Sequence, residues 1–351
     1  MKMKRNFLII WSMALLLCAC TSKVETDPVL NTSAQAVETT IEETSSPETE
    51  SEMTEPADST NQPSKSIETS APLTPNSVST ETQNTAFIDA DALPMIDGST
   101  ACIPLMLQVV EEVSGMSPDD AQFYINSTGT NNCWNNLLNG DADIILAYEM
   151  PEATNSNWKS SFEDIDLEIA PIGVDALVFL VNEKNPVFSL TQQQLIDIYT
   201  GKTTNWSSVG GDDIEIAPFQ RDASSGSQTL FRKLLMKDIT PMKPTDRYIA
   251  LDMGFLIESV ANYNNAGNAI GYSVYYYVTH MKNDPSLRFL SVDGVAPNDD
   301  TIADGSYPLR NNFFAAIRAD TPADSPARMI FDWLSGESGA QCLRNAGYIP
   351  A

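Results

Sequence analysis

The sequence has few of the groups that usually carry metal or nucleic-acid chemistry. It contains one histidine in 351 residues, and 20 lysines and arginines against 47 aspartates and glutamates. A single histidine, His280, excludes histidine-based metal clusters and most catalytic triads. The scarcity of basic residues excludes a generic nucleic-acid binder, because neutralising phosphates needs a basic surface. Any ligand chemistry therefore falls to hydroxyl, carboxylate, arginine and backbone groups.

Long apolar runs are also scarce, and the first one lies in a short leader. Three basic residues precede the apolar stretch 7–17, which is too short to span a bilayer as a resident helix. The motif LCAC that ends at Cys20 resembles a bacterial lipobox. The resemblance implies that residues 1–19 are a lipoprotein signal peptide and that acyl chains such as palmitate on Cys20 anchor the protein to a membrane. The alternative is an ordinary cleaved signal with incidental cysteines.

The segment 20–89 has almost no apolar periodicity and is dominated by Thr, Ser, Glu and Pro. Positions 21–90 carry 13 acidic and 2 basic side chains. Such a segment cannot bury enough apolar surface to offset the entropy of ordering it. We therefore expect a disordered tether that holds a folded domain away from the membrane.

From position 90 onward, short apolar runs alternate with amphipathic ones, and this pattern predicts an α/β fold. Thr191 and Gln194 have the spacing of a helix capping box. The expected strands are 122–126, 142–147, 168–173, 176–182, 214–220 and 269–272. The expected helices are 103–114, 131–139, 191–199, 227–237, 253–264 and 325–334.

Three loops rich in small and hydroxyl residues each open an expected helix. They are 97–102 (DGSTAC), 126–130 (NSTGT) and 221–227 (RDASSGS). Ser and Thr are common helix caps, so a single loop of this kind indicates nothing more than capping. Three such loops, one of which contains Arg221, favour a site where free backbone N–H groups, hydroxyls and one guanidinium hold a tetrahedral anion.

These residues resemble the phosphate-binding lipoproteins that serve phosphate-specific ABC importers. The resemblance runs from about 93 to 348, and its motifs occur in the order DGSTA at 97–101, DADIILAYE at 141–149, NP at 185–186, NW at 205–206, RDASSGSQT at 221–229, IGY at 270–272 and YPL at 307–309. It implies a type II periplasmic-binding-protein-like fold, in which two lobes joined by two crossover strands close over a ligand. By analogy, lobe one comprises 90–172 plus 271–351, and lobe two comprises 173–270.

The resemblance also implies a set of phosphate ligands. Arg221, Ser225, Gly226 and Ser227 correspond to the donors of the second lobe, and Ser127 and Thr128 to hydroxyl donors of the first lobe. The entry loop adds Ser99, Thr100 and Cys102, and Glu149 falls where the family has an Asp that accepts the proton of hydrogen phosphate.

Three positions depart from the family pattern. Cys102 replaces a hydroxyl donor, Ala223 replaces an acid that some members carry, and Glu149 is one methylene longer than Asp. Cys102 and Cys133 start two neighbouring expected helices, and they either form a disulfide with each other or remain buried free thiols. The disulfide state of the third cysteine of the expected domain, Cys342, is equally open. The sequence leaves both possibilities open.

The sequence thus predicts a monomeric, non-enzymatic receptor, lipid-anchored on the outer face of the bacterial cell membrane. It would capture inorganic phosphate and deliver it to ABC permease subunits, without a cofactor or metal and without binding nucleic acid. One alternative is a surface adhesin, a sensory lipoprotein or a receptor for another oxyanion with the same fold. Another is a phosphoester hydrolase with Ser225 or Ser227 as nucleophile, although the sequence offers it no positioned base.

Overall fold

A computed structural model describes residues 86–245, 248–263 and 267–351, and strands alternate with helices throughout them. The expected leader 1–19, the lipidation site Cys20 and most of the tether lie outside the described residues. The last tether residues are packed: Ile88 is buried, and the N–H groups of Phe87 and Ile88 both donate to Val113 O. The folded part therefore begins before residue 90.

One eight-stranded mixed sheet organises the fold, with the strand order β1-β2-β11-β3-β8-β5, while β12 and β9 also pair with β3. Two small two-stranded sheets, β10 with β4 and β6 with β7, complete the strands. Their bounds are β1 Ile96–Gly98, β2 Ile144–Ala147, β3 Leu167–Asn182, β4 Ser189–Leu190, β5 Ala217–Pro218, β6 Gln220–Arg221, β7 Ile249–Ala250, β8 Ala269–Val274, β9 Leu287–Phe289, β10 Ser291–Val292, β11 Arg310–Arg318 and β12 Ile349–Pro350.

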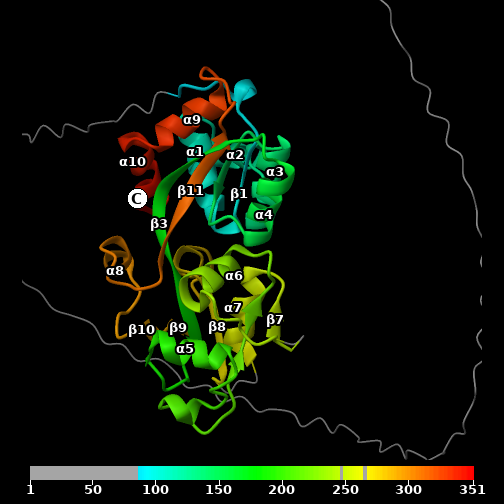
Figure 1. Cartoon of the computed structure of the whole chain (residues 1–351). Helices are drawn as coiled ribbons and strands as arrows, with labels where there is room; N and C mark the ends of the chain where they lie inside the picture. The colour runs from blue at the N-terminus through cyan, green and yellow to red at the C-terminus, as the bar shows by residue number, and fades with distance from the viewer. Residues whose placement is uncertain (1–85, 246–247, 264–266) are drawn as a thin grey trace, which may run out of the picture. The chain divides into compact units, whose positions relative to one another are not determined.

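Strand β3 links the two halves of this sheet (Figure 1). Its residues 167–176 pair with β11, and its residues 177–181 pair with β8. We call the elements around β1, β2 and β11 the first lobe and those around β8 and β5 the second lobe. The expected boundary at residue 271 falls within β8, and β9 and β10 pair with β3 and β4, so the second-lobe sheet extends beyond that boundary.

The single strand β3 replaces the two strands expected at 168–173 and 176–182. Strand β3 contains a proline and a glycine, which a β-bulge accommodates: Phe314 faces Pro171 while Phe313 faces Gly173. Proline lacks the N–H that a regular ladder needs, and a bulge tolerates its absence. A side chain at Gly173 would overlap the Phe313 ring, so glycine is required at this crossing.

Two other expected strands are also corrected. Residues 122–124 form a 3₁₀ turn that continues the short helix α2, because Ser117 caps that helix and Pro118 fixes its first turn. Only Ile125 makes a bridge, to Ile96. The segment expected as one strand at 214–220 is reduced to β5, and β6 follows after one residue in a different sheet.

The helices agree more closely with expectation. The helix expected at 103–114 has the same bounds in the structure, and the capping box of Thr191 and Gln194 is confirmed. The helix expected at 227–237 instead begins as α6 and continues as the π-helical segment η5, Phe231–Met236. The α-helices are α1 Ile103–Ser114, α2 Pro118–Ala121, α3 Thr130–Asn139, α4 Glu152–Ser161, α5 Gln192–Tyr199, α6 Gly226–Leu230, α7 Met253–Asn262, α8 Asp299–Ala303, α9 Pro326–Leu334 and α10 Glu337–Asn345.

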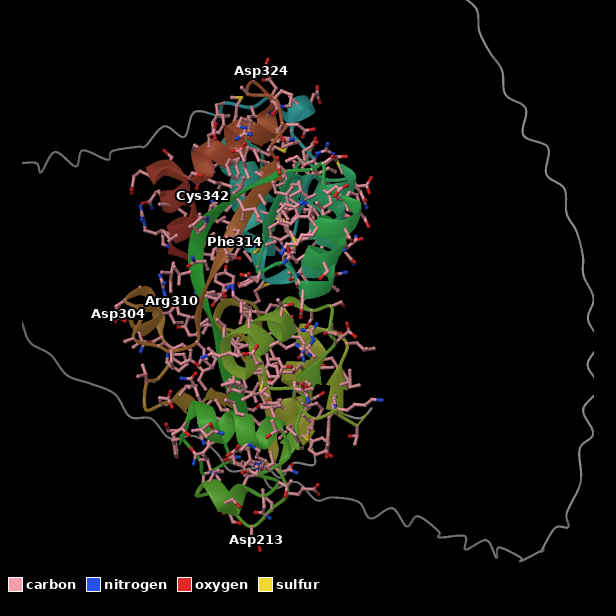
Figure 2. All side chains as sticks on the ribbon, in the orientation of Figure 1. Asp213, Asp304, Arg310, Phe314, Asp324 and Cys342 are labelled. Carbon is pink, nitrogen blue, oxygen red and sulfur yellow. The ribbon has the colours of Figure 1, made fainter. Side chains whose placement is uncertain are left out.

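A continuous apolar core runs through both lobes. Side chains of β3 such as Phe179 and Val178 are fully buried, as are Phe313 on β11 and Tyr272 on β8. Arg310 and Phe314, labelled in Figure 2, mark the course of β11. None of the helices in the described part of the chain is long and apolar enough to cross a membrane.

The cysteines of the folded part are free thiols. Cys102, Cys133 and Cys342 are buried and unpaired, and Cys342 lies on α10 (Figure 2). Burial raises the pKa of each thiol above its ordinary value, because the thiolate would lose its hydration. The structure therefore decides between the two possibilities in favour of inert buried thiols.

Candidate functional site

A polar cavity of about 380 Å³ lies where four helix N-termini meet. Two belong to the first lobe, at η2/α1 and α3, and two belong to the second lobe, at α6 and α7. The free N–H groups and positive dipole ends at such termini favour an anionic ligand. The lining residues are Ser99, Thr100, Ala101, Thr128, Gly129, Thr130, Asn131, Asn132, Tyr148, Arg221, Asp222, Ser224, Ser225, Gly226, Ser227, Leu251, Asp252, Met253, Val274 and Tyr277.

Most residues expected to bind the anion meet at this cavity. Seven of them line it: Ser99, Thr100, Thr128, Arg221, Ser225, Gly226 and Ser227. They come from three separate loops, at 97–102, 126–130 and 221–227. The convergence of the three hydroxyl-rich loops, on which the anion-site hypothesis depended, is thus present in the structure.

The first-lobe wall of the cavity is a hydrogen-bonded hydroxyl network. Ser99 Oγ lies 2.9 Å from Thr130 Oγ1 and accepts a hydrogen bond from Tyr148 N. Both Ser99 and Thr130 are buried. Because each hydroxyl can rotate, the pair can supply one donor proton to a ligand while keeping its internal bond.

Asp97 anchors the second loop of the first lobe. Its carboxylate is buried and accepts hydrogen bonds from Thr128 N, from Thr128 Oγ1 at 2.6 Å and from Asn136 Nδ2 at 2.7 Å. Thr128 therefore donates its hydroxyl proton to Asp97 rather than to a ligand. The network fixes the loop before α3, so that the N-terminal amides of that helix reach the cavity edge.

In the part of the chain that the structure describes, Arg221 is the one cation that lines the cavity, and backbone carbonyls hold its side chain. Nε donates to Ala250 O and Nη2 to Leu251 O, which leaves Nη1 without a partner among the described residues. Burial lowers the pKa of the guanidinium from its ordinary value, while nearby Tyr272 and Asp252 act in the opposite direction. Arginine stays charged in either case, so the cavity holds a preorganised cation with free donor capacity.

The N-terminus of α6 presents an unsatisfied hydroxyl. Ser225 caps the helix by accepting from Gln228 N, and Gly226 and Ser227 follow in the first turn. Ser227 is 4% exposed, and its Oγ is buried without a hydrogen-bond partner among the described residues. A buried hydroxyl without a partner costs free energy of about 1–3 kcal/mol. Since Ser227 lines the cavity, a bound oxyanion would remove that cost.

Sequence reasoning missed the fourth wall of the cavity, at the junction of β7 and α7. Leu251, Asp252 and Met253 line it, together with Tyr277 from the segment after β8. Asp252 caps α7 by accepting a hydrogen bond from Phe255 N at 2.7 Å. The available signal was an Asp directly before an amphipathic run, which is typical of a helix start. It was missed because this loop lacks the small hydroxyl residues of the other three.

Three expected site residues lie elsewhere. Cys102 is fully buried in the core behind the entry loop, and Ser127 is exposed outside the cavity lining. Glu149 forms an ion pair with Lys233 in η5, with 2.8 Å between Oε2 and Nζ. That pair bridges the two lobes beside a separate polar cleft, so the Glu149 carboxylate does not reach the anion cavity.

The described residues contain no group of three or more side chains suited to holding a metal ion.

A buried carboxylate connects the cavity wall to β3. Asp175 accepts hydrogen bonds from Tyr148 OH at 2.5 Å, from Ala176 N and from Tyr276 N. Burial raises the pKa of Asp175 from 3.8 to about 6, although these hydrogen bonds act to lower it. Tyr148 also lines the cavity, so Asp175 ties the wall of the first lobe to the strand that joins the lobes.

The raised pKa of Asp175 makes stability depend on pH. The folded state binds a proton more tightly than the unfolded state, so this stabilising contribution is complete below pH 3.8 and is lost as the pH rises through about 6. Between about pH 7.5 and pH 5, the wild-type chain should gain roughly 1 kcal/mol in free energy of unfolding relative to Asp175→Asn. Denaturant unfolding of both proteins across this range measures the difference, and a difference independent of pH would contradict the assignment.

Comparison with known proteins finds a matching family model and relatives that share one name. A family model described as a PBP superfamily domain matches residues 74–334. Phosphate-binding protein PstS of Bacillus subtilis (strain 168) is 27% identical over 256 residues, which cover 73% of this chain and 79% of that protein. Phosphate-binding protein PstS of Borreliella burgdorferi is 22% identical over 267 residues, which cover 74% of this chain and 91% of that protein.

Solved structures show the same two-lobed architecture. A phosphate ABC transporter substrate-binding protein from Clostridium perfringens, with bound phosphate, aligns with a TM-score of 0.59 and 25% identity, covering 74% of this chain and 99% of that one. An ABC-type phosphate transport receptor from Vibrio cholerae aligns with a TM-score of 0.56 and 26% identity, and the alignment covers 73% of this chain and 99% of that one. The expected two-lobed α/β fold is thereby confirmed.

Proposed function

Because the chain belongs to the PBP superfamily, we propose that it is a receptor that captures inorganic phosphate and delivers it to an ABC importer. The names of its relatives support phosphate as the ligand and an ABC transporter as the destination. The protein would act by binding and release, without chemical conversion. Ser225 Oγ is engaged as a helix cap, and Ser227 Oγ has no base within hydrogen-bonding distance among the described residues.

The observation that carries the proposal is the buried Ser227 hydroxyl, which has no partner in the described part of the chain and lies in the same cavity as the Arg221 guanidinium. Together they offer a charge-assisted donor and a neutral donor to one tetrahedral oxyanion. The folded domain is acidic, so long-range attraction does not favour an anion, and binding depends on these short-range donors. Binding through short-range donors also suits a receptor that must release its ligand again.

We assign the ligand contacts to the cavity-lining members of the expected set: Ser99, Thr100, Thr128, Arg221, Ser225, Gly226 and Ser227. Thr128 would contribute through its backbone and its support of the loop, because its hydroxyl proton is committed to Asp97. We further propose that the two lobes divide within β3 and after β10 and that they close on the anion.

The tethered location remains part of the proposal. The lipobox-like motif at Cys20 and the acidic, Ser/Thr-rich segment that follows support a lipid-anchored domain outside the cytoplasmic membrane. Mass spectrometry of the protein from membranes tests this point. A mature chain that begins at Cys20 with attached acyl chains is expected, and a chain that begins elsewhere without a lipid would contradict it.

Calorimetric titration of the purified domain with phosphate and with sulfate tests the function itself. We expect saturable binding of phosphate and weaker binding of sulfate. Absence of any phosphate binding, or equal affinity for both anions, would contradict the assignment of phosphate as the ligand. Titration with other oxyanions under the same conditions would then identify a different ligand.

A further inference from the structure

The Arg221 and Ser227 donors of the cavity lie on one short loop of the second lobe. Arg221 ends β6, and Ser227 lies in the first turn of α6. The two side chains can bind one anion together only if the loop keeps a fixed shape, because a displacement of about 1 Å takes a donor out of hydrogen-bonding range. A residue that holds the ends of this loop would therefore control affinity without touching the ligand.

A single hydroxyl group contacts both ends of the loop. Tyr272 OH, on β8, accepts a hydrogen bond from Arg221 N at 3.1 Å and donates its proton to Gln228 Oε1. A phenol hydroxyl has one proton to donate and two lone pairs, so one group can serve both contacts. Tyr272 is 1% exposed and lies outside the cavity lining. It can therefore act on a bound anion only through the loop.

The Tyr272 ring is held in place by its aromatic neighbours. It stacks on Phe231 with 4.4 Å between ring centroids and 3° between ring planes, and it packs edge-on against Phe179 and Tyr199. Phe179 lies directly opposite Tyr272 in the pairing of β3 with β8. The position of the hydroxyl is thus set by the strand that joins the two lobes.

The contact with Gln228 reaches the start of α6. Gln228 is 5% exposed, and its N–H donates to the capping oxygen Ser225 Oγ at 3.2 Å. A side chain held by Tyr272 therefore fixes the first turn of the helix, which carries the Ser227 hydroxyl. The other contact fixes the backbone of Arg221, from which the guanidinium extends into the cavity.

We propose that Tyr272 is a positioning residue of the anion site, whose hydroxyl sets the spacing between the Arg221 guanidinium and the Ser227 hydroxyl. This inference rests on the proposed function and adds to it a residue that determines affinity from outside the cavity. Without the hydroxyl, Arg221 N and Gln228 Oε1 would each lose a partner, and the loop would shift to satisfy them.

The substitution Tyr272→Phe tests the proposal, because it keeps the ring and removes only the hydroxyl. We expect the affinity for phosphate, measured by calorimetric titration, to fall about tenfold or more. Gln228→Met removes the contact from its other side and should also weaken phosphate binding, so the test does not depend on one variant. Thermal unfolding checks that each variant is folded.

The double variant Tyr272→Phe/Gln228→Met separates positioning from stability. It replaces the buried amide that Tyr272→Phe leaves without a partner, so it should regain part of the free energy of unfolding lost by the single variant. It should not regain phosphate affinity, because the loop is still untied from β8. Recovery of affinity together with stability would show that the hydroxyl only stabilises the fold, and would overturn the proposal.

Tyr307→Phe is the matched control. Tyr307 is also fully buried, and its hydroxyl donates to Leu177 O at 3.1 Å, away from the loop. This variant should lower the free energy of unfolding while it binds phosphate as the wild type does. Wild-type phosphate affinity in both Tyr272→Phe and Gln228→Met would overturn the role of Tyr272. Failure of the wild-type protein to bind phosphate would instead overturn the proposed function.

Discussion

Replacing Arg221 by alanine should weaken phosphate binding at least about 100-fold, which is about 2.7 kcal/mol. Among the described residues, Arg221 is the only cation that lines the cavity, and its orientation is fixed by Ala250 O and Leu251 O before any ligand arrives. A charge-assisted hydrogen bond contributes about 1.5–3 kcal/mol, and a guanidinium can make two to one anion. Calorimetric titration of the variant with phosphate measures the loss directly.

Two further variants separate geometry from charge. Arg221→Lys keeps the positive charge but lacks the paired, planar N–H donors of the guanidinium and cannot make both carbonyl contacts. We therefore expect its phosphate affinity to lie between those of Arg221→Ala and the wild type. Arg344→Ala removes a guanidinium that is paired with Glu337 on α10, away from the cavity, and should bind phosphate as the wild type does. Equal affinities for Arg221→Ala and the wild type would remove Arg221 from the site.

Replacing Gly226 by alanine should weaken phosphate binding about 10- to 100-fold with little change in the free energy of unfolding. A methyl group at Gly226 would overlap Thr130 Oγ1, and it would lie 3.1 Å from Thr130 Cβ. Thr130 begins α3 in the first lobe, and Gly226 begins α6 in the second. The added methyl therefore holds the lobes apart, and overpacking of this kind costs about 1–3 kcal/mol.

The double variant Gly226→Ala/Thr130→Ala tests whether the loss comes from this contact. Removing Oγ1 and Cγ2 of Thr130 relieves most of the overlap, so the alanine at position 226 should cost less affinity in the Thr130→Ala background than in the wild type. Gly336→Ala is the matched control, since its methyl would meet its nearest atom at 3.6 Å, an ordinary contact. If the penalty at position 226 is the same in both backgrounds, the clash across the cavity is not its cause.

The parts of the fold that could be predicted from sequence are those with strong local signals. The amphipathic run at 103–114 and the capping box at Thr191 specify their helices through nearby residues alone. The continuity of β3 could not be foreseen, because it depends on a bulge opposite Phe313 and Phe314, more than 130 positions away. Local sequence there contains Pro171 and Gly173, which by themselves indicate a break.

The site residues likewise fall into those with a local sequence signal and those placed by long-range contacts. Hydroxyl-rich helix starts are visible in the sequence, and seven of the residues expected from them line one cavity. Glu149 was expected at the ligand from its place in a motif, but its partner Lys233 is distant in sequence and belongs to the other lobe. Asp252 carries only an ordinary capping signal, and its position beside Arg221 arises from the pairing of β6 with β7. Long-range pairing of this kind cannot be predicted from one sequence.

The most direct measurement is a crystal structure of the folded domain grown with phosphate. We expect a tetrahedral anion in the cavity, within hydrogen-bonding distance of Ser227 Oγ and the Arg221 guanidinium and next to Asp252. An anion bound instead in the cleft beside Glu149 and Lys233, or a cavity without an anion at saturating phosphate, would contradict the proposed site.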